Sequence, residues 1–168
     1  MPQAVVHVLF TIIVIDLFRD YVIKNKRSIP LLFVFIGGVA GLLPDADIPV
    51  YWLFKNILGI QVEWFHRTIT HSLFFPLMFL AIALIFLSVS KKYFILFAII
   101  SFGTGFHIFL DYVFSGYIMP FYPFSTATYG LDLFTKTGFV AIANGVDAIV
   151  LLLWLWHEEV RHKISDFI

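Results

Sequence analysis

Long apolar stretches separated by short polar segments dominate the pattern of the chain. A membrane-spanning helix needs roughly 20 mostly apolar residues. Five stretches approach that length, at residues 4–23, 29–43, 73–89, 94–114 and 139–156. The pattern predicts an all-α fold: a polytopic membrane helical bundle of about five transmembrane helices, built as a single domain over residues 1–168. The segments at residues 44–72 and 115–138 are expected to be long loops on the same side of the bundle.

The second stretch is short and contains three glycines. Gly37, Gly38 and Gly41 are the kind of small residues that let membrane helices approach one another closely. We therefore expect this helix to be packed inside the bundle.

Composition supports the membrane interpretation. Of the 168 residues, 61% are hydrophobic and only 13% are charged, whereas about 25% are charged in soluble domains. A soluble domain of this size has too much surface to hide so much apolar area. Because the net charge is zero, no basic field exists to attract nucleic acid, and a nucleic-acid partner is not expected. The chain has no cysteine, which excludes disulfides and thiolate metal sites.

The basic residues are distributed unevenly between the two sides of the predicted bundle. Eight follow the first, third and fifth stretches, namely Arg19, Lys24, Lys26, Arg27, Lys91, Lys92, Arg161 and Lys163. The other three lie in the two long loops, namely Lys55, Arg67 and Lys136. By the positive-inside rule, the C-terminus is expected on the cytoplasmic side of the cell membrane, and the N-terminus and the long loops on the non-cytoplasmic side.

Seven histidine and aspartate side chains gather at the non-cytoplasmic ends of the predicted helices. They are His7, Asp45, Asp47, His66, His71, His107 and Asp111. Taken singly, each has an ordinary structural interpretation. The segment that begins at Pro44 could be a helix-ending turn, Thr70 could cap the third helix, and His107 and Asp111 could be a buried pair on one helix face.

Taken together, the seven side chains predict a metal centre. Imidazole and carboxylate ligands suit zinc, manganese or iron(II), and seven of them exceed what one ion needs. We expect two zinc ions, with three as the larger alternative, and with aspartates bridging them. Paired metals typically clamp a phosphoester and lower the pKa of a bound water.

Two further residues allow two interpretations each. Asp147, three residues after Asn144 in the fifth stretch, could be a hydrogen-bond anchor between helices, or it could be a deep metal ligand or orient one. Arg67 could bind a phosphate oxygen, since guanidinium matches phosphate geometry, or it could extend to anionic lipid.

In these motifs the sequence resembles the YdjM-type family of membrane-bound, metal-dependent hydrolases, some of them LexA-regulated. The matching elements are His7, Pro44-Asp45-x-Asp47, His66-Arg67-x-x-Thr70-His71-Ser72, His107-x-x-x-Asp111 and Tyr122-Pro123-Phe124-Ser125. That family is distantly similar to the zinc-dependent phospholipase C and single-strand nuclease group, whose helical scaffold holds three zinc ions. The resemblance implies phosphoester hydrolysis. The group's second His-x-x-x-Glu helix has no counterpart here, so two ions remain the expectation.

Three functions remain open from the sequence. The first is a hydrolase of a lipid or lipid-linked phosphoester that uses a metal-activated water, with catalytic roles for Asp45, Asp47, Arg67 and Asp111. The second is a metal-dependent amide or ester hydrolase of an acylated lipid. The third is a metal transporter or metal-stabilised membrane scaffold, which the confinement of the polar cluster to one side disfavours.

Overall fold

The fold is helical throughout the part of the chain that the structure describes. The computed structural model describes residues 4–23, 28–59, 66–133 and 140–162. Its longer helices are α1 (Ala4–Tyr21), α2 (Leu31–Ala40), α4 (Phe74–Phe86), α5 (Lys91–Leu110) and α7 (Val140–His162). These ranges contain no β-strand, only an isolated antiparallel bridge between Ile118 and Tyr129. The predicted all-α class is therefore confirmed.

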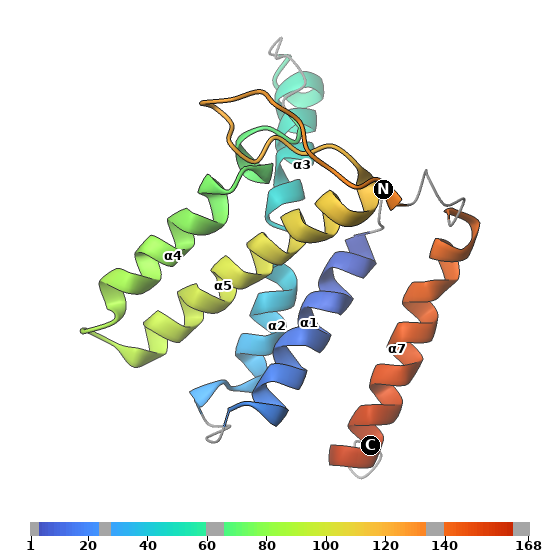
Figure 1. Ribbon diagram of the computed structural model, residues 1–168. Helices are drawn as coiled ribbons and strands as arrows, with labels where there is room; N and C mark the ends of the chain where they lie inside the picture. The colour runs from blue at the N-terminus through green and yellow to red at the C-terminus, as the bar shows by residue number, and fades with distance from the viewer. Residues whose placement is uncertain (1–3, 24–27, 60–65, 134–139, 163–168) are drawn as a thin grey trace.

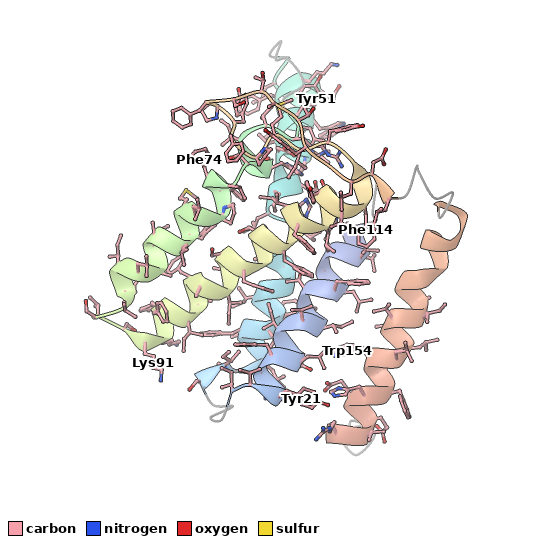
Figure 2. The ribbon with its side chains drawn as sticks, in the orientation of Figure 1. Tyr21, Tyr51, Phe74, Lys91, Phe114 and Trp154 are labelled. Carbon is pink, nitrogen blue, oxygen red and sulfur yellow. The ribbon has the colours of Figure 1, made fainter. Side chains whose placement is uncertain are left out.

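The five longer helices alternate in direction, as the sequence predicts (Figure 1). Helix α2 contacts both α1 and α5, α4 packs on α5, and α7 contacts α1. The start of α1, the ends of α2 and α5 and the start of α4 meet at one end of the bundle, which we call the site end. Figure 2 shows Tyr51, Phe74 and Phe114 at the site end and Tyr21 and Lys91 at the opposite end.

The number of membrane spans stays a prediction. Judged by length and composition, one described helix, Lys91–Phe114, can cross a membrane. The pair Leu31–Ala40 and Pro44–Ile57 passes the same test together, with a bend of 50° between its halves. Helix α4 is apolar but has 13 residues, fewer than a straight span needs.

The described part of the predicted loop at residues 44–72, up to residue 59, is more helical than expected. A 3₁₀ turn at Pro44–Ala46 leads into α3 (Asp47–Trp52), and a π-helical turn at Leu53–Ile57 follows it. The sequence prediction took Pro44 and its aspartates as turn signals. Proline is equally suited to the first position of a helix, and acidic side chains are favourable near a helix N-terminus. The same residues therefore start a helix here.

Close packing of small residues fixes α2 between its neighbours. A Cβ on Gly37 would collide with Ile15 of α1, and a Cβ on Gly103 of α5 would collide with the carbonyl oxygen of Gly37. The prediction that this short helix packs inside the bundle is thus confirmed. The contact also sets the height of α5, because His107 lies one turn beyond Gly103 and reaches the site end.

Candidate metal centre

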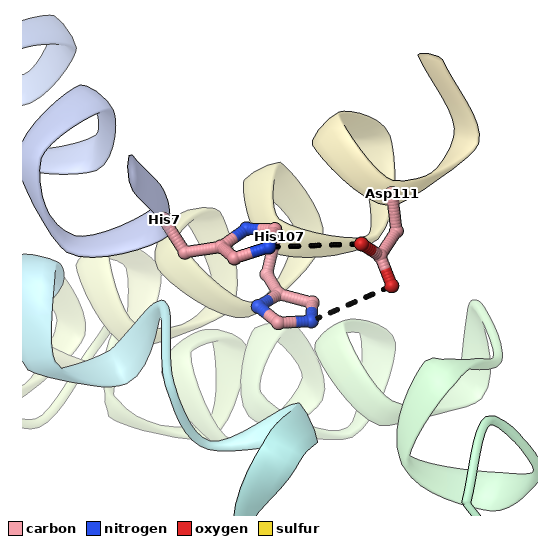
Figure 3. A group of neighbouring side chains, drawn as sticks. All are labelled: His7, His107 and Asp111. Atoms are coloured by element: carbon pink, nitrogen blue, oxygen red, sulfur yellow. Dashed lines mark ion pairs between the residues drawn. The ribbon is translucent and has the colours of Figure 1, made fainter. Parts of the chain in front are cut away.

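All seven predicted ligands lie together at the site end. Their donor atoms form three overlapping groups, each within 4.8 Å, which could hold a metal ion. The groups are His7–His107–Asp111, Asp45–His71–His107 and Asp47–His66–His71. Figure 3 shows the first of these groups, in which α1 and α5 place two histidines beside one carboxylate. Helices distant in sequence thus assemble a set of donors that could bind a divalent cation.

The central group forms a nearly regular triangle of donor atoms. The Nε2 atoms of His71 and His107 lie 3.3 Å apart. The Oδ1 atom of Asp45 lies 3.4 Å from the first and 3.6 Å from the second. Ligands at 2.0–2.1 Å in a tetrahedron are separated by about 3.3–3.4 Å. The triangle therefore matches one face of a tetrahedral zinc site.

Hydrogen bonds on the far side of both central rings fix their tautomers. His107 Nδ1 lies 2.6 Å from the carbonyl oxygen of Gly41, which can only accept, so this nitrogen carries the proton. The Thr70 hydroxyl donates to Asp47 Oδ2 at 2.8 Å and lies 3.1 Å from His71 Nδ1. Its only proton is used, so it accepts from His71. In their neutral forms both rings then turn an Nε2 lone pair into the triangle, as metal-binding histidines do.

Asp111 presents its two oxygens to different partners. Its Oδ2 lies 3.6 Å from His71 Nε2 and 3.9 Å from His107 Nε2, whereas its Oδ1 lies 3.6 Å from His7 Nε2 (Figure 3). The α-helical winding of α5 ends at this residue, where a π-helical turn (Asp111–Ser115) begins. Such turns often occur at functional sites. The carboxylate therefore contributes a donor atom to each of two neighbouring histidine groups.

The third group lies on the Nδ1 side of His71. Asp47 Oδ1 lies 2.9 Å from His66 Nδ1, and Asp47 Oδ2 lies 3.8 Å from His71 Nδ1. Through the Thr70 hydroxyl the same carboxylate is linked to His71. Asp47 and His66 can therefore hold an ion of their own or orient His71 for the central group.

Arg67 lies beside the cluster with an unusual backbone. Its NH2 atom is 3.1 Å from Asp111 Oδ2, and its side chain is 20% exposed. Its φ of 63° falls in the left-handed region, which is uncommon for a residue other than glycine. Outliers of this kind concentrate at functional sites. The guanidinium thus lies next to the candidate ligands and remains partly open to solvent.

The cluster is buried and rich in negative charge. The side chains of His71 and His107 are fully buried, and that of Asp111 is 4% exposed, whereas Asp45 is 30% exposed on the open side. Among the described residues of the cluster there are three carboxylates and one arginine, Arg67, which pairs with Asp111. Buried charges are normally paired or bound to metal, so the excess of carboxylate suits divalent cations.

The sequence analysis missed two groups that position the candidate ligands. One further candidate, Asp147, has a side chain that the structure does not describe. The carbonyl of Gly41 holds His107, and Thr70 serves Asp47 and His71 without capping α4, which begins at Phe74. The role of Thr70 could have been suspected from its position next to His71 in the sequence. The role of the Gly41 carbonyl could not, because a backbone group leaves no pattern in the sequence. Asp147 belongs to α7, in the part of that helix where the structure describes no side chains.

Comparison with known proteins shows the family. No curated protein and no solved structure matches the chain. The family model described as YdjM inner membrane protein matches residues 1–163, which is nearly the whole chain. The chain therefore belongs to the YdjM family of inner membrane proteins.

Proposed function

We propose that this protein is a membrane-embedded, metal-dependent hydrolase of a lipid or lipid-linked phosphoester. The observation that carries the proposal is the convergence of lone pairs at the site end. The Nε2 atoms of His71 and His107 lie 3.3 Å apart, and each lies 3.4–3.9 Å from an oxygen of Asp45 and an oxygen of Asp111. Donors of this kind repel one another unless a cation lies among them.

The geometry supports two ions, each with its own donor atoms. The central ion would be held by Asp45 Oδ1 and the Nε2 atoms of His71 and His107, with Asp111 Oδ2 beside them. The second would be held by His7 Nε2 and Asp111 Oδ1. Zinc fits this nitrogen and oxygen set best, and manganese or iron(II) could also be bound. Asp47 and His66 would then orient His71.

Phosphoester hydrolysis makes use of the residues around this centre. Paired divalent ions, when bound, lower the pKa of water and neutralise charge on a phosphate. Arg67 is close enough to bind a non-bridging phosphate oxygen, because its guanidinium lies 3.1 Å from Asp111. The exposed side of Asp45 leaves an approach for the substrate.

The side of the membrane is part of the proposal. The site end carries Tyr51, Phe74 and Phe114, and the opposite end carries Lys91 and Tyr21, to which Arg161 donates a hydrogen bond. We therefore place the site end on the non-cytoplasmic side and the C-terminus in the cytoplasm. Because the chain has no cysteine, single substitutions test this directly. Thr126→Cys, in the segment that follows the π-helical turn at Asp111–Ser115, should react with an impermeant maleimide from outside intact cells. Ser88→Cys between α4 and α5 should react only after permeabilisation. The reverse pattern would overturn the orientation.

Hydrolysis is tested with the purified full chain in lipid nanodiscs. Phospholipids labelled in the headgroup should release the phosphorylated or dephosphorylated headgroup when zinc is present, and the His107→Ala variant should release none. Release of fatty acid from an acyl-amide or ester panel, with intact phosphoesters, would overturn the phosphoester assignment. Zinc flux into liposomes without hydrolysis would favour a transporter.

A further inference from the structure

An apolar groove lies between α1 and α7. It has a volume of about 600 Å³. Its lining includes Val5, Val8, Ile12, Leu42, Leu151 and Trp154. Figure 2 shows Trp154 on α7 between the two helices. The groove therefore offers an apolar ligand a channel along the first turns of α1.

The groove and the candidate metal centre share the same two pieces of backbone. On α1, His7 faces Asp111, and the next residue, Val8, lines the groove. After α2, Gly41 holds His107 through its carbonyl, and the next residue, Leu42, lines the groove. A Cβ on Gly41 would lie 3.2 Å from the carbonyl oxygen of His7, so the two pieces are in contact. One end of the groove is thus next to the cluster.

Beyond the groove, polar contacts tie α7 to α1. The Tyr21 hydroxyl lies 3.3 Å from His157 Nε2 and accepts a hydrogen bond of 3.0 Å from Arg161. The guanidinium of Arg161 also lies over the Tyr21 ring, 5.0 Å from its centre. These contacts hold the two helices together at the end opposite the cluster. The space between α1 and α7 is therefore closed by these contacts at the end opposite the cluster.

The position of the groove selects among apolar occupants. The part of α1 that lines it, from residue 4 to residue 12, is about 12 Å long at 1.5 Å per residue. The groove is lined by apolar side chains and lies beside the candidate metal centre, so an occupant with an apolar tail and a phosphate head would fit both. A single hydrocarbon chain attached to a phosphate headgroup has this form. Its polar head would then lie at the level of the cluster, with the chain running along α1 into the membrane.

We infer that this groove binds a fatty acyl chain of the substrate, so that the substrate is an acylated membrane lipid whose phosphate lies at the metal centre. This inference rests on the proposed function. It adds the substrate class and assigns α7 a role in holding the lipid. The acyl chain accounts for a lining that is apolar along the first three turns of α1.

The test reads lipid binding without hydrolysis. The full chain in nanodiscs is exposed to phosphatidylglycerol that carries a diazirine in one acyl chain, and cross-linked peptides are identified by mass spectrometry after illumination. We expect labels to concentrate on the peptides of α1 and α7 that line the groove. Leu151→Trp should fill the groove and remove most of this label. Leu152→Trp is the matched control, because the neighbouring Leu152 is 66% exposed and is not part of the lining.

Each outcome has a separate meaning for the two proposals. Labels spread evenly over the lipid-facing helices, or an equal loss of label in both tryptophan variants, would overturn the acyl-chain site. So would a disulfide between two copies of Val8→Cys, since it would show that a second chain fills the groove. The labelling should persist in His107→Ala, so loss of hydrolysis with intact labelling leaves this inference standing. Hydrolysis together with labels that are not concentrated in the groove would overturn the acyl-chain site and leave the proposed function standing.

Discussion

The Nε2 atoms of His71 and His107 face each other across 3.3 Å, although 36 positions separate the two residues in the chain. Each ring has its Nδ1 engaged on the opposite side, by the Thr70 hydroxyl and the Gly41 carbonyl respectively. Two neutral rings held in this way direct lone pairs at each other. A cation bound between them would replace this repulsion with attraction, as in the metal centre that we propose.

Replacing one of these rings should remove the central ion and abolish hydrolysis together. His107→Ala removes a donor of the central triangle and leaves α5 intact, because alanine is a good helix former. We expect the variant to be helical by circular dichroism, to bind less metal than the wild type because the central ion is lost, and to release no headgroup. His157→Ala, which removes a histidine far from the cluster, should keep both properties. Full activity in His107→Ala would exclude the central triangle as the catalytic centre.

Thr70 should act as a positioning residue. Thr70→Val keeps the shape of the side chain but loses the hydroxyl between Asp47 and His71. Loss of such a supporting contact typically lowers metal affinity about 10–100-fold. Thr70→Ser retains the hydroxyl and should restore affinity. Competition with a chelator of known affinity measures the change, and equal affinities for the valine and serine variants would remove Thr70 from the site.

Arg67 should serve the substrate and leave metal content unchanged. Arg67→Lys keeps one positive charge but loses the planar pair of donors that fits phosphate. We expect kcat/KM for the phosphoester to fall and the metal-to-protein ratio to stay at the wild-type value. Steady-state kinetics and elemental analysis of the same preparation test both expectations. Unchanged kinetics would mean that Arg67 only extends toward anionic lipid.

The contact of α5 with α2 should control the height of His107. Gly103→Ala places a methyl group against the carbonyl oxygen of Gly37, whereas a Cβ on Gly105 would meet Pro76 at an ordinary 3.5 Å. Overpacking of this kind costs about 1–3 kcal/mol. We expect Gly103→Ala to unfold at a lower temperature and to bind metal more weakly, and Gly105→Ala to resemble the wild type. Identical melting curves for the two variants would contradict the packing account.

The sequence predicted the helical class and the gathering of the ligands because both follow from spacing. Apolar stretches define helices, and the alternation of five helices brings His7, Asp45, His71 and His107 to one end. Which of those ligands belong to the same group could not be predicted. It depends on which nitrogen of His71 faces Asp45 and which faces Asp47, and tertiary packing alone decides this.

Helix α3 was missed for a related reason. Pro44 and the aspartates after it are equally compatible with a turn and with the first turn of a helix. The choice depends on contacts with distant segments, such as the hydrogen bond from Thr70 to Asp47 across 23 positions. The apolar groove between α1 and α7 could not be predicted from the sequence either, because these two helices lie at opposite ends of the chain.

The metal content of the purified protein tests the central claim most directly. The wild-type chain, incubated with zinc and freed of loosely bound ions, should retain about two zinc ions per chain when measured by plasma mass spectrometry. The double variant His71→Ala/His107→Ala should retain fewer, and the loss should include the central ion. A wild-type chain that retains no zinc, manganese or iron, or a double variant that retains as much metal as the wild type, would contradict the account.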